Sequence, residues 1–190
     1  MADIKGVLLN AWVNFLKERY SPQAVTDALE TLDSEDRIIL AKPFLASSWY
    51  PYDMLHALRR LTRTLWKPEE GDISPDIGRR MAQEAFTGVY RSLLVNDPVK
   101  QVEKFSWIGD FFFREARKLE TEITGEASCL VRYRYQQGAN PSQAICASLK
   151  SFWSRTLELA GAENVAANHP KCTARGDALC EFSFQWKSRA

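Results

Sequence analysis

The sequence predicts an α+β fold in which an N-terminal helical part packs on a C-terminal, mainly antiparallel sheet. Apolar residues recur at helical spacing through the first two-thirds of the chain, and apolar–polar alternation typical of strands begins only near residue 118. A helical segment then separates two pairs of predicted strands. Helices followed by a β-β-α-β-β run are typical of a sheet that helices cover on one face.

The first helices are marked by an apolar stripe and by helix-start signals. Residues 4–20 carry apolar side chains at a period near 3.6, and Ser21 with Pro22 starts a second helix that runs to about residue 32. Residues 38–48 are ambiguous because Pro43 limits any helix there. A third helix begins at Pro51 or Asp53.

Two further helix-start signals complete the helical part. Ser74-Pro75-Asp76 predicts a helix to about residue 95, and Asn96-Asp97-Pro98 restarts the chain into another. Strands are expected over residues 118–124 and 127–135. A helix is expected over 141–159, and strands over 164–173 and 178–186 with a turn at Gly176-Asp177 between them.

Composition excludes several classes of protein. Lys and Arg total 25 against 24 Asp and Glu, a net charge of +1 that gives no general attraction for nucleic acid. No segment is polybasic. The N-terminus lacks the pattern of a signal peptide, and no apolar run approaches the roughly 20 residues that span a bilayer. We therefore expect a cytoplasmic protein, in which metal thiolates are favoured over disulfides.

Four residues near the C-terminus have the spacing of a tetrahedral metal site. The pattern is Cys-x22-His-x2-Cys-x7-Cys, formed by Cys146, His169, Cys172 and Cys180. Three thiolates and one imidazole are a common structural zinc set. Two buried cysteines, a spare thiol and a surface histidine are the alternative, and spacing and ligand softness favour the metal.

Both ends of the chain resemble one superfamily. The opening residues 4–10 are similar to the start of the haem nitric-oxide/oxygen-binding (H-NOX) domains. Residues 172–182 resemble a C-terminal signature shared by those domains and the 4-vinyl reductase domains. The resemblance implies a single domain over residues 1–190, with a helical subdomain (1–116) and a ββαββ zinc-binding subdomain (117–190). It also implies that the same four residues bind zinc and staple the last helix to the terminal hairpin.

The sequence departs from the family where haem is held. The resemblance implies a haem-ligating histidine just before the sheet, but residues 104–117 contain none. A Tyr-x-Ser-x-Arg motif that grips the haem propionates is expected around residues 133–140, and its serine and arginine are missing. We therefore expect a haem-free member, with His56 as the one imidazole left for haem and an ordinary half-buried histidine as the favoured interpretation.

Aromatic side chains are the candidates for a ligand pocket. The family implies a cavity between the helical part and the sheet, and the expected lining is Trp107, Phe111, Phe112, Tyr133 and Tyr135. The same residues also suit an ordinary core. Phe111 to Phe113 cannot all face inward, so one of them is free to meet a partner.

No catalytic motif is present, so we expect no enzyme. The predicted function is a sensor of a small hydrophobic or aromatic ligand that signals through a partner protein and forms a homodimer. The alternatives are a zinc-thiolate redox switch and an auxiliary protein that binds tetrapyrroles.

Overall fold

The computed structural model describes residues 2–136 and 142–187. Its α-helices are α1 (Gly6–Tyr20), α2 (Pro22–Glu30), α3 (Ser34–Leu40), α4 (Met54–Leu65), α5 (Ser74–Thr87), α6 (Pro98–Glu103), α7 (Phe105–Phe112) and α8 (Gln143–Leu159). Its strands are β1 (Asp3–Lys5), β2 (Trp49–Pro51), β3 (Phe113–Arg114), β4 (Arg117–Gly125), β5 (Ser128–Tyr135), β6 (Glu163–Lys171) and β7 (Cys180–Lys187). The predicted α+β class is confirmed.

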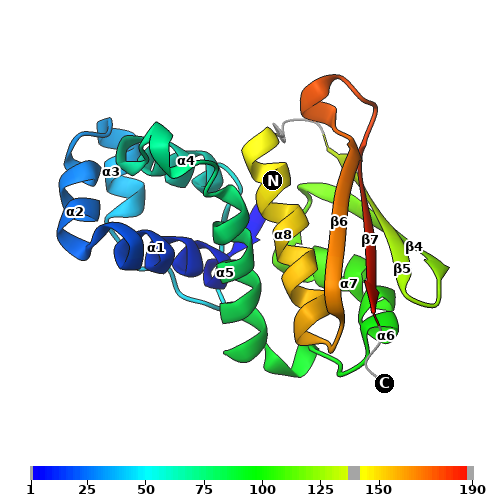
Figure 1. Ribbon diagram of the computed structural model, residues 1–190. Coiled ribbons are helices and arrows are strands. Elements are labelled where there is room, and N and C mark those ends of the chain that lie inside the picture. The colour runs from blue at the N-terminus through cyan, green and yellow to red at the C-terminus, as the bar shows by residue number, and fades with distance from the viewer. Residues whose placement is uncertain (1, 137–141, 188–190) are drawn as a thin grey trace.

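The larger sheet has the predicted β-β-α-β-β connection. Its strand order is β4-β5-β7-β6, and every neighbouring pair is antiparallel. Helix α8 joins the two hairpins and packs along the sheet, while α1 to α4 form the opposite end of the molecule (Figure 1). Along β7, Phe182, Phe184 and Trp186 are buried, as the alternation predicted.

A smaller sheet was missed by the sequence analysis. Strand β1 pairs with both β2 and β3, so the predicted helix over residues 4–20 begins only at Gly6. Strands of two or three residues are too short to present an alternation, and tertiary pairing alone specifies them. This sheet ties the N-terminus to the chain entering α4 and to the chain leaving α7.

One predicted helix end is corrected and one helix was not predicted. Helix α5 ends at Thr87 and not near residue 95, because Gly88 follows and the Tyr90 ring turns inward onto Phe111 and Phe112, with centroids 5.0 and 5.6 Å away. Ser34–Leu40 forms α3, which overlaps the undecided stretch 38–48 only at its last three residues. The last predicted helix begins at Gln143 among the described residues, and its expected start at Pro141 lies outside them.

Helices α5 and α8 pack against each other more closely than ordinary side chains allow. A Cβ built on Gly78 would lie 1.9 Å from the carbonyl oxygen of Ser148, so only glycine fits. The Ser148 hydroxyl donates to the carbonyl of Ser74 at 2.8 Å, at the start of α5. This contact fixes α8 between α5 and the sheet.

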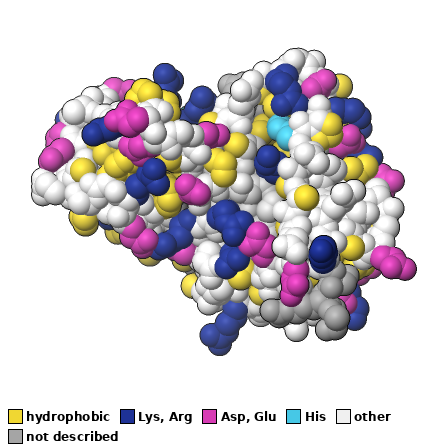
Figure 2. All heavy atoms as spheres, in the orientation of Figure 1, with side chains coloured by type: hydrophobic (Ala, Val, Ile, Leu, Met, Phe, Trp, Pro, Cys, Tyr) yellow, Lys and Arg dark blue, Asp and Glu magenta, His cyan; other side chains and the backbone are white. Residues whose placement is uncertain are grey.

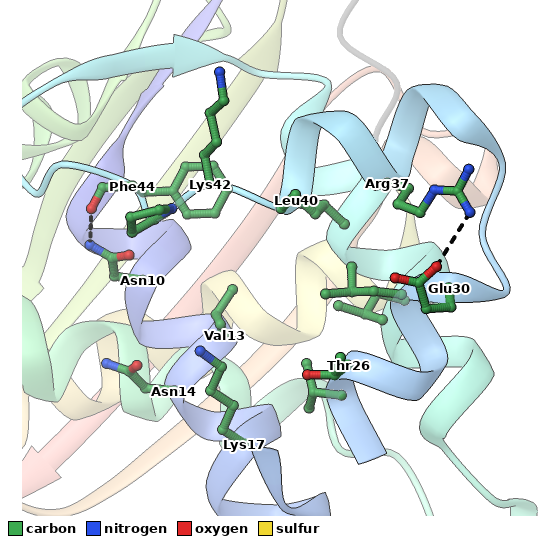
Figure 3. A pocket seen from close by; sticks show the side chains of 15 residues that line it. Asn10, Val13, Asn14, Lys17, Thr26, Glu30, Arg37, Leu40, Lys42 and Phe44 are labelled. Carbon is green, nitrogen blue, oxygen red and sulfur yellow. Dashed lines mark hydrogen bonds and ion pairs between the residues drawn. The ribbon is translucent and has the colours of Figure 1, made fainter. Parts of the chain in front are cut away.

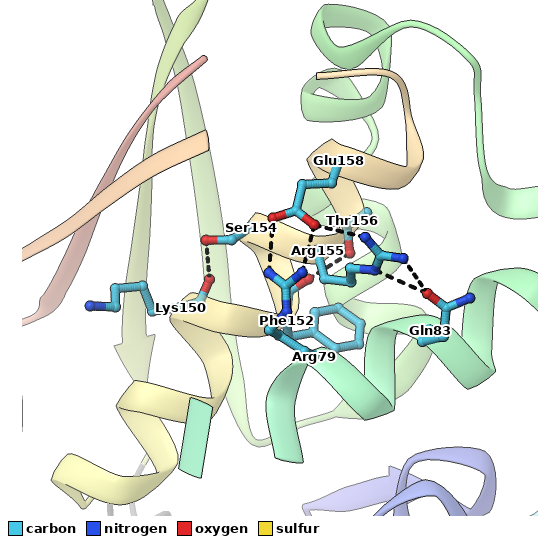
Figure 4. Close-up of polar contacts among 8 residues, drawn as sticks. All are labelled: Arg79, Gln83, Lys150, Phe152, Ser154, Arg155, Thr156 and Glu158. Carbon is cyan, nitrogen blue, oxygen red and sulfur yellow. Dashed lines mark hydrogen bonds and ion pairs between the residues drawn. The ribbon is translucent and has the colours of Figure 1, made fainter. Parts of the chain in front are cut away.

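Charged groups reinforce the same contact at its other end. Both terminal N–H₂ groups of Arg79 donate hydrogen bonds of 2.8 Å to the Glu158 carboxylate. Arg155 donates to both Glu158 and Gln83 and so links the two side chains (Figure 4). The side chains are partly exposed, so this network orients the helices more than it stabilises them.

On the face drawn in Figure 2, basic and acidic side chains are interspersed. Within the described residues, no helix has the length and apolarity that crossing a membrane requires.

Replacing Gly78 by alanine tests the close helix contact by the sign of its effect. Alanine in a helix interior normally adds about 1 kcal/mol of stability over glycine. Here the added methyl would meet the Ser148 carbonyl, and overpacking of this kind costs about 1–3 kcal/mol or more. We expect chemical denaturation to give a net loss for Gly78→Ala. The exposed Thr87→Ala on the same helix should change the free energy of unfolding by less than about 0.5 kcal/mol. A Gly78→Ala variant as stable as the parent would contradict the contact.

Candidate metal centre

Helix α8 presents the first residue of the cysteine and histidine cluster. The Ser142 side chain caps the helix by accepting from the backbone N–H of Ile145 at 3.2 Å. Cys146 therefore lies in the first turns of α8, fully buried against the sheet. Its position on the helix was predicted from the sequence.

The hairpin between β6 and β7 presents the other cysteines. Gly176 adopts φ of 97°, which glycine tolerates without strain, and closes a short turn after Cys172. The backbone N–H of Cys172 donates to the Asp177 carboxylate at 2.7 Å. Cys180 then starts β7 directly opposite Tyr133 of β5. The turn thus brings both sulfurs to the side that faces α8.

The four candidate ligands lie close enough to share one ion. The sulfur of Cys146 is 3.6 Å from that of Cys180 and 3.8 Å from that of Cys172. The ligand atoms of all three cysteines and His169 lie within 4.8 Å of one another. Thiolates bound to one tetrahedral zinc at about 2.3 Å are about 3.8 Å apart, so the spacing fits such an ion.

The environment of His169 points to the same centre. Its ring stacks on Phe182 at 4.2 Å, and its Nε2 is buried without a hydrogen-bond partner among the described residues. A buried polar atom without a partner is costly, and coordination would satisfy it. Arg175 donates to the carbonyl oxygen of His169 at 2.8 Å and fixes the backbone there.

One cysteine of the cluster, Cys180, favours the thiolate over the thiol. A hydrogen bond from the Cys146 thiol, and others from the hydroxyl and backbone N–H of Thr173, lower the pKa of Cys180 well below its usual value. The backbone donor lies 3.3 Å from the sulfur. The thiolate is the form that binds metals. Cys129 differs, because burial raises its pKa to about 12, and it lies on β5 opposite Phe184.

The aromatic residues expected to line a pocket lie in different environments. Trp107 is 54% exposed, and its ring packs at a tilt against that of the half-buried Phe111, with the centroids 5.5 Å apart. Phe112 is buried against Phe86 and Phe152. Tyr133 is buried, and its hydroxyl accepts a hydrogen bond from the Trp153 indole; Tyr135 is half-buried beside it.

Two adjoining cavities lie between the helical part and α8, and the inner one also reaches the start of β4. An inner cavity of about 20 Å³ is lined by Trp12, Leu55, Met81, Phe113, Arg117, Ile145, Ser148, Leu149 and Phe152. An outer cleft of about 480 Å³ opens beside it between α4, α5 and α8. Trp12, Ile145 and Ser148 line both. The residues expected from the sequence line neither.

A buried polar group at the inner cavity was missed by the sequence analysis. Arg117 is 4% exposed, and none of its guanidinium nitrogens has a hydrogen-bond partner among the described residues. It shares an inward face of β4 with the apolar Leu119. A basic residue in phase with an inward-facing apolar position is the signal that would have found it.

Another cleft, at the far end of the helical part, is lined by one ion pair and by two lysines, Lys17 and Lys42. It holds about 460 Å³ and lies between α1, α2 and α3 (Figure 3). Asn10 donates to the carbonyl of Phe44, and Arg37 pairs with Glu30 at 3.5 Å. His56, on α4, lies outside the three cavities described so far, half-buried with its ring 6.4 Å from that of Tyr52.

Comparisons with known proteins identify the architecture. No protein-family model matches the sequence, and no curated protein sequence matches it. An H-NOX protein variant from S. oneidensis in the Fe(II) ligation state is similar in structure, with a TM-score of 0.71, 12% identity and 98% of each chain covered. The H-NOX protein from S. oneidensis in the Fe(II)NO state has a TM-score of 0.69 and 13% identity, with 97% of this chain and 100% of that chain covered. The unliganded Fe(II) H-NOX protein from K. algicida has a TM-score of 0.65 and 13% identity, with 98% of both chains covered.

Exchanging single cysteines tests the cluster. We expect Cys180→Ser to lower bound zinc from about one ion per chain to well under one, because a closed tetrahedral site needs all its ligands. The matched variant Cys129→Ser, also buried but outside the cluster, should keep its zinc. Metal analysis by plasma mass spectrometry of protein purified without chelator measures both. Equal zinc content in the two variants would argue against the site.

Proposed function

This chain has the H-NOX fold over nearly its whole length, and from that premise we propose that it is a non-catalytic, haem-free domain that binds a small molecule and signals through a partner protein. Within this proposal, residues 1–190 form one domain, with a helical subdomain (1–116) and a ββαββ subdomain (117–190). The solved relatives are haem proteins, described in Fe(II) and Fe(II)NO states. The question for this chain is therefore whether its residues suit the same group.

The size of the space between the helical part and the sheet carries the haem-free proposal. The inner cavity holds about 20 Å³, whereas pockets for small molecules usually hold about 300–1,000 Å³. The inner cavity is surrounded by Phe113, Phe152 and Trp12, and the charged Arg117 forms part of its wall. A porphyrin does not fit there. The outer cleft is larger, but no histidine is among its lining residues.

The histidines give the same answer. The chain has two, and His169 lies in the cysteine cluster. His56 lines a separate surface cleft with Asp36 and Arg60. Burial lowers the pKa of His56 from its usual value. A haem axial ligand needs an imidazole that faces the haem, and neither residue lies on the inner cavity or the outer cleft.

We assign zinc to the cluster of Cys146, His169, Cys172 and Cys180. When bound, the ion would supply four bonds between α8, the end of β6 and the start of β7. All four positions would be filled by protein ligands, which is typical of a structural site and leaves no open position for catalysis. The ion would hold the hairpin against α8, so that its loss would loosen the C-terminal part.

The proposed signal would pass through contact with another chain. Trp107 exposes 54% of its surface, and with Phe111 it forms an aromatic patch on α7. Exposed aromatic residues are enriched at protein interfaces. Helix α7 leads directly into β3 and β4, where Arg117 borders the inner cavity, so a change there would reach this patch. A homodimer contact is one use of such a patch.

A redox switch is the second candidate, favoured by the spacing of the sulfurs. Oxidation by peroxide would take two electrons from the thiolates of Cys146 and Cys180, now 3.6 Å apart, to form one disulfide bond and reduce the peroxide to water. The metal would then leave. All three sulfurs are buried, however, and reactive cysteines are usually partly exposed. The sensor proposal therefore comes first.

Haem uptake tests the leading proposal. Protein expressed with a haem precursor should purify colourless, and haemin added afterwards should give no saturable Soret band, because the cavity is too small. The His56→Ala variant should behave identically. A stoichiometric Soret band that disappears in His56→Ala would overturn the haem-free proposal.

Peroxide treatment tests the redox candidate separately. If zinc is a structural staple, micromolar peroxide should release little zinc to a chromogenic chelator, in the parent and in Cys129→Ser alike. Rapid release that added thiol reverses would favour the switch over the staple.

A further inference from the structure

Three side chains with buried polar ends lie close together, and one of them, Arg117, lines the inner cavity. They are Arg117 at the start of β4, Tyr135 at the end of β5 and Tyr52 just before α4; we call them the polar cluster. Arg117 and Tyr135 are directly opposite in the β4–β5 ladder. The three guanidinium nitrogens and both hydroxyl oxygens are buried. Tyr52 lies close enough to Arg117 to interact with it, but no hydrogen bond of good geometry satisfies any of these five atoms within residues 2–136 and 142–187.

The positive charge of Arg117 acts on the pKa of both tyrosines, Tyr52 and Tyr135. Burial raises the pKa of Tyr52 and of Tyr135, and the nearby guanidinium opposes that rise in each. The guanidinium also lies over the rings of Phe113 and Tyr133, 3.7 and 4.7 Å from their centroids. These ring faces favour a cation but accept none of its hydrogen bonds.

A buried arginine without hydrogen-bond partners would be stabilised by a bound anion. Arginine stays protonated in proteins, and a buried charge without a hydrogen-bonded partner is strongly unfavourable. The planar guanidinium matches a carboxylate through two parallel hydrogen bonds, and the tyrosine hydroxyls add donors. No carboxylate of a described residue pairs with Arg117, although other arginines of the chain do form such pairs.

The outer cleft suits the rest of such a ligand. Its volume of about 480 Å³ is within the range of small-molecule sites, and Trp12, Ile73, Ile77 and Ile145 give it an apolar wall. The indole N–H groups of Trp12 and Trp66 are already bonded to Thr62 and Gly71, so their rings present only apolar surface. Arg59 and Arg63 also line this cleft, where their charge would attract an anion.

We propose that this domain binds an apolar carboxylate, with the carboxylate held by Arg117, Tyr52 and Tyr135 and the apolar body in the outer cleft. The inference rests on the proposed function, because it names the class of ligand for that domain. Trp12, Ile145 and Ser148 line both spaces, so a side-chain shift at these positions joins them. The cavity of about 20 Å³ marks where the head group enters.

The competing explanation makes Arg117 a counter-ion of the metal cluster. Three thiolates on a divalent ion leave a net negative charge, and Cys146 is among the groups that act on Arg117. That charge would offset the guanidinium but would leave its five N–H donors and the two hydroxyls unbonded. The two explanations predict opposite effects when the charge is removed.

Calorimetric titration of the zinc-loaded, full-length protein tests the proposal. The probes are decanoate and 4-phenylbutyrate, each compared with its alcohol, decanol and 4-phenylbutanol. We expect each carboxylate to bind at least about tenfold more tightly than its alcohol, as a charge-assisted pair requires. Arg117→Met should abolish this preference, whereas Arg134→Met, an exposed arginine on β5, should leave it intact.

Two further variants keep the test decisive. If Arg117→Met does not fold, Tyr52→Phe and Tyr135→Phe keep both rings and should each weaken carboxylate binding about two- to tenfold. Without ligand, Arg117→Met should melt at the same or a higher temperature with its zinc retained; a lower melting temperature with zinc loss would favour the counter-ion.

Equal binding of acids and alcohols would overturn the carboxylate inference and leave the small-molecule site standing. Binding of neither class would also overturn the inference. Haem uptake, in contrast, is the result that would overturn the proposed function itself.

Discussion

The close contact between α5 and α8 sets the position of everything else in this protein. Because Gly78 has no side chain, the backbone of α8 comes against α5 at Ser148, with Cys146 one half-turn before this point and Phe152 one turn after it. Cys146 is thereby held over the β6–β7 hairpin, and Phe152 and Trp153 fill the space above the sheet. A larger residue at position 78 would move Cys146 and the cavity wall together.

Aromatic packing leaves little room between the helical part and the sheet. The rings of Phe105 and Trp153 are 4.1 Å apart, and the Trp153 indole bonds to Tyr133 across to the sheet. Aromatic packing of this density leaves Arg117 as the one charged wall of the inner cavity. Ligand choice would therefore be governed by Arg117 and two hydroxyls at the head group, and by the apolar wall of the outer cleft with Arg59 and Arg63 in its lining.

The sequence predicted those features that are encoded locally. The place of Cys146 in the first turns of α8, the hairpin at Gly176 and the convergence of Cys146, Cys172 and Cys180 follow from caps, turns and spacing. The strand β1 and the early end of α5 depend on partners distant in sequence, which no local pattern reveals. The polar cluster was missed for the same reason, since Tyr52 and Arg117 meet only in the folded chain.

We propose that this chain carries zinc in place of haem within an H-NOX fold. Native mass spectrometry of the full-length protein, purified without chelator after expression with a haem precursor, measures both groups at once. We expect the mass of the chain plus one zinc ion and no porphyrin. A mass corresponding to the chain with haem, or to the chain with neither group, would contradict it.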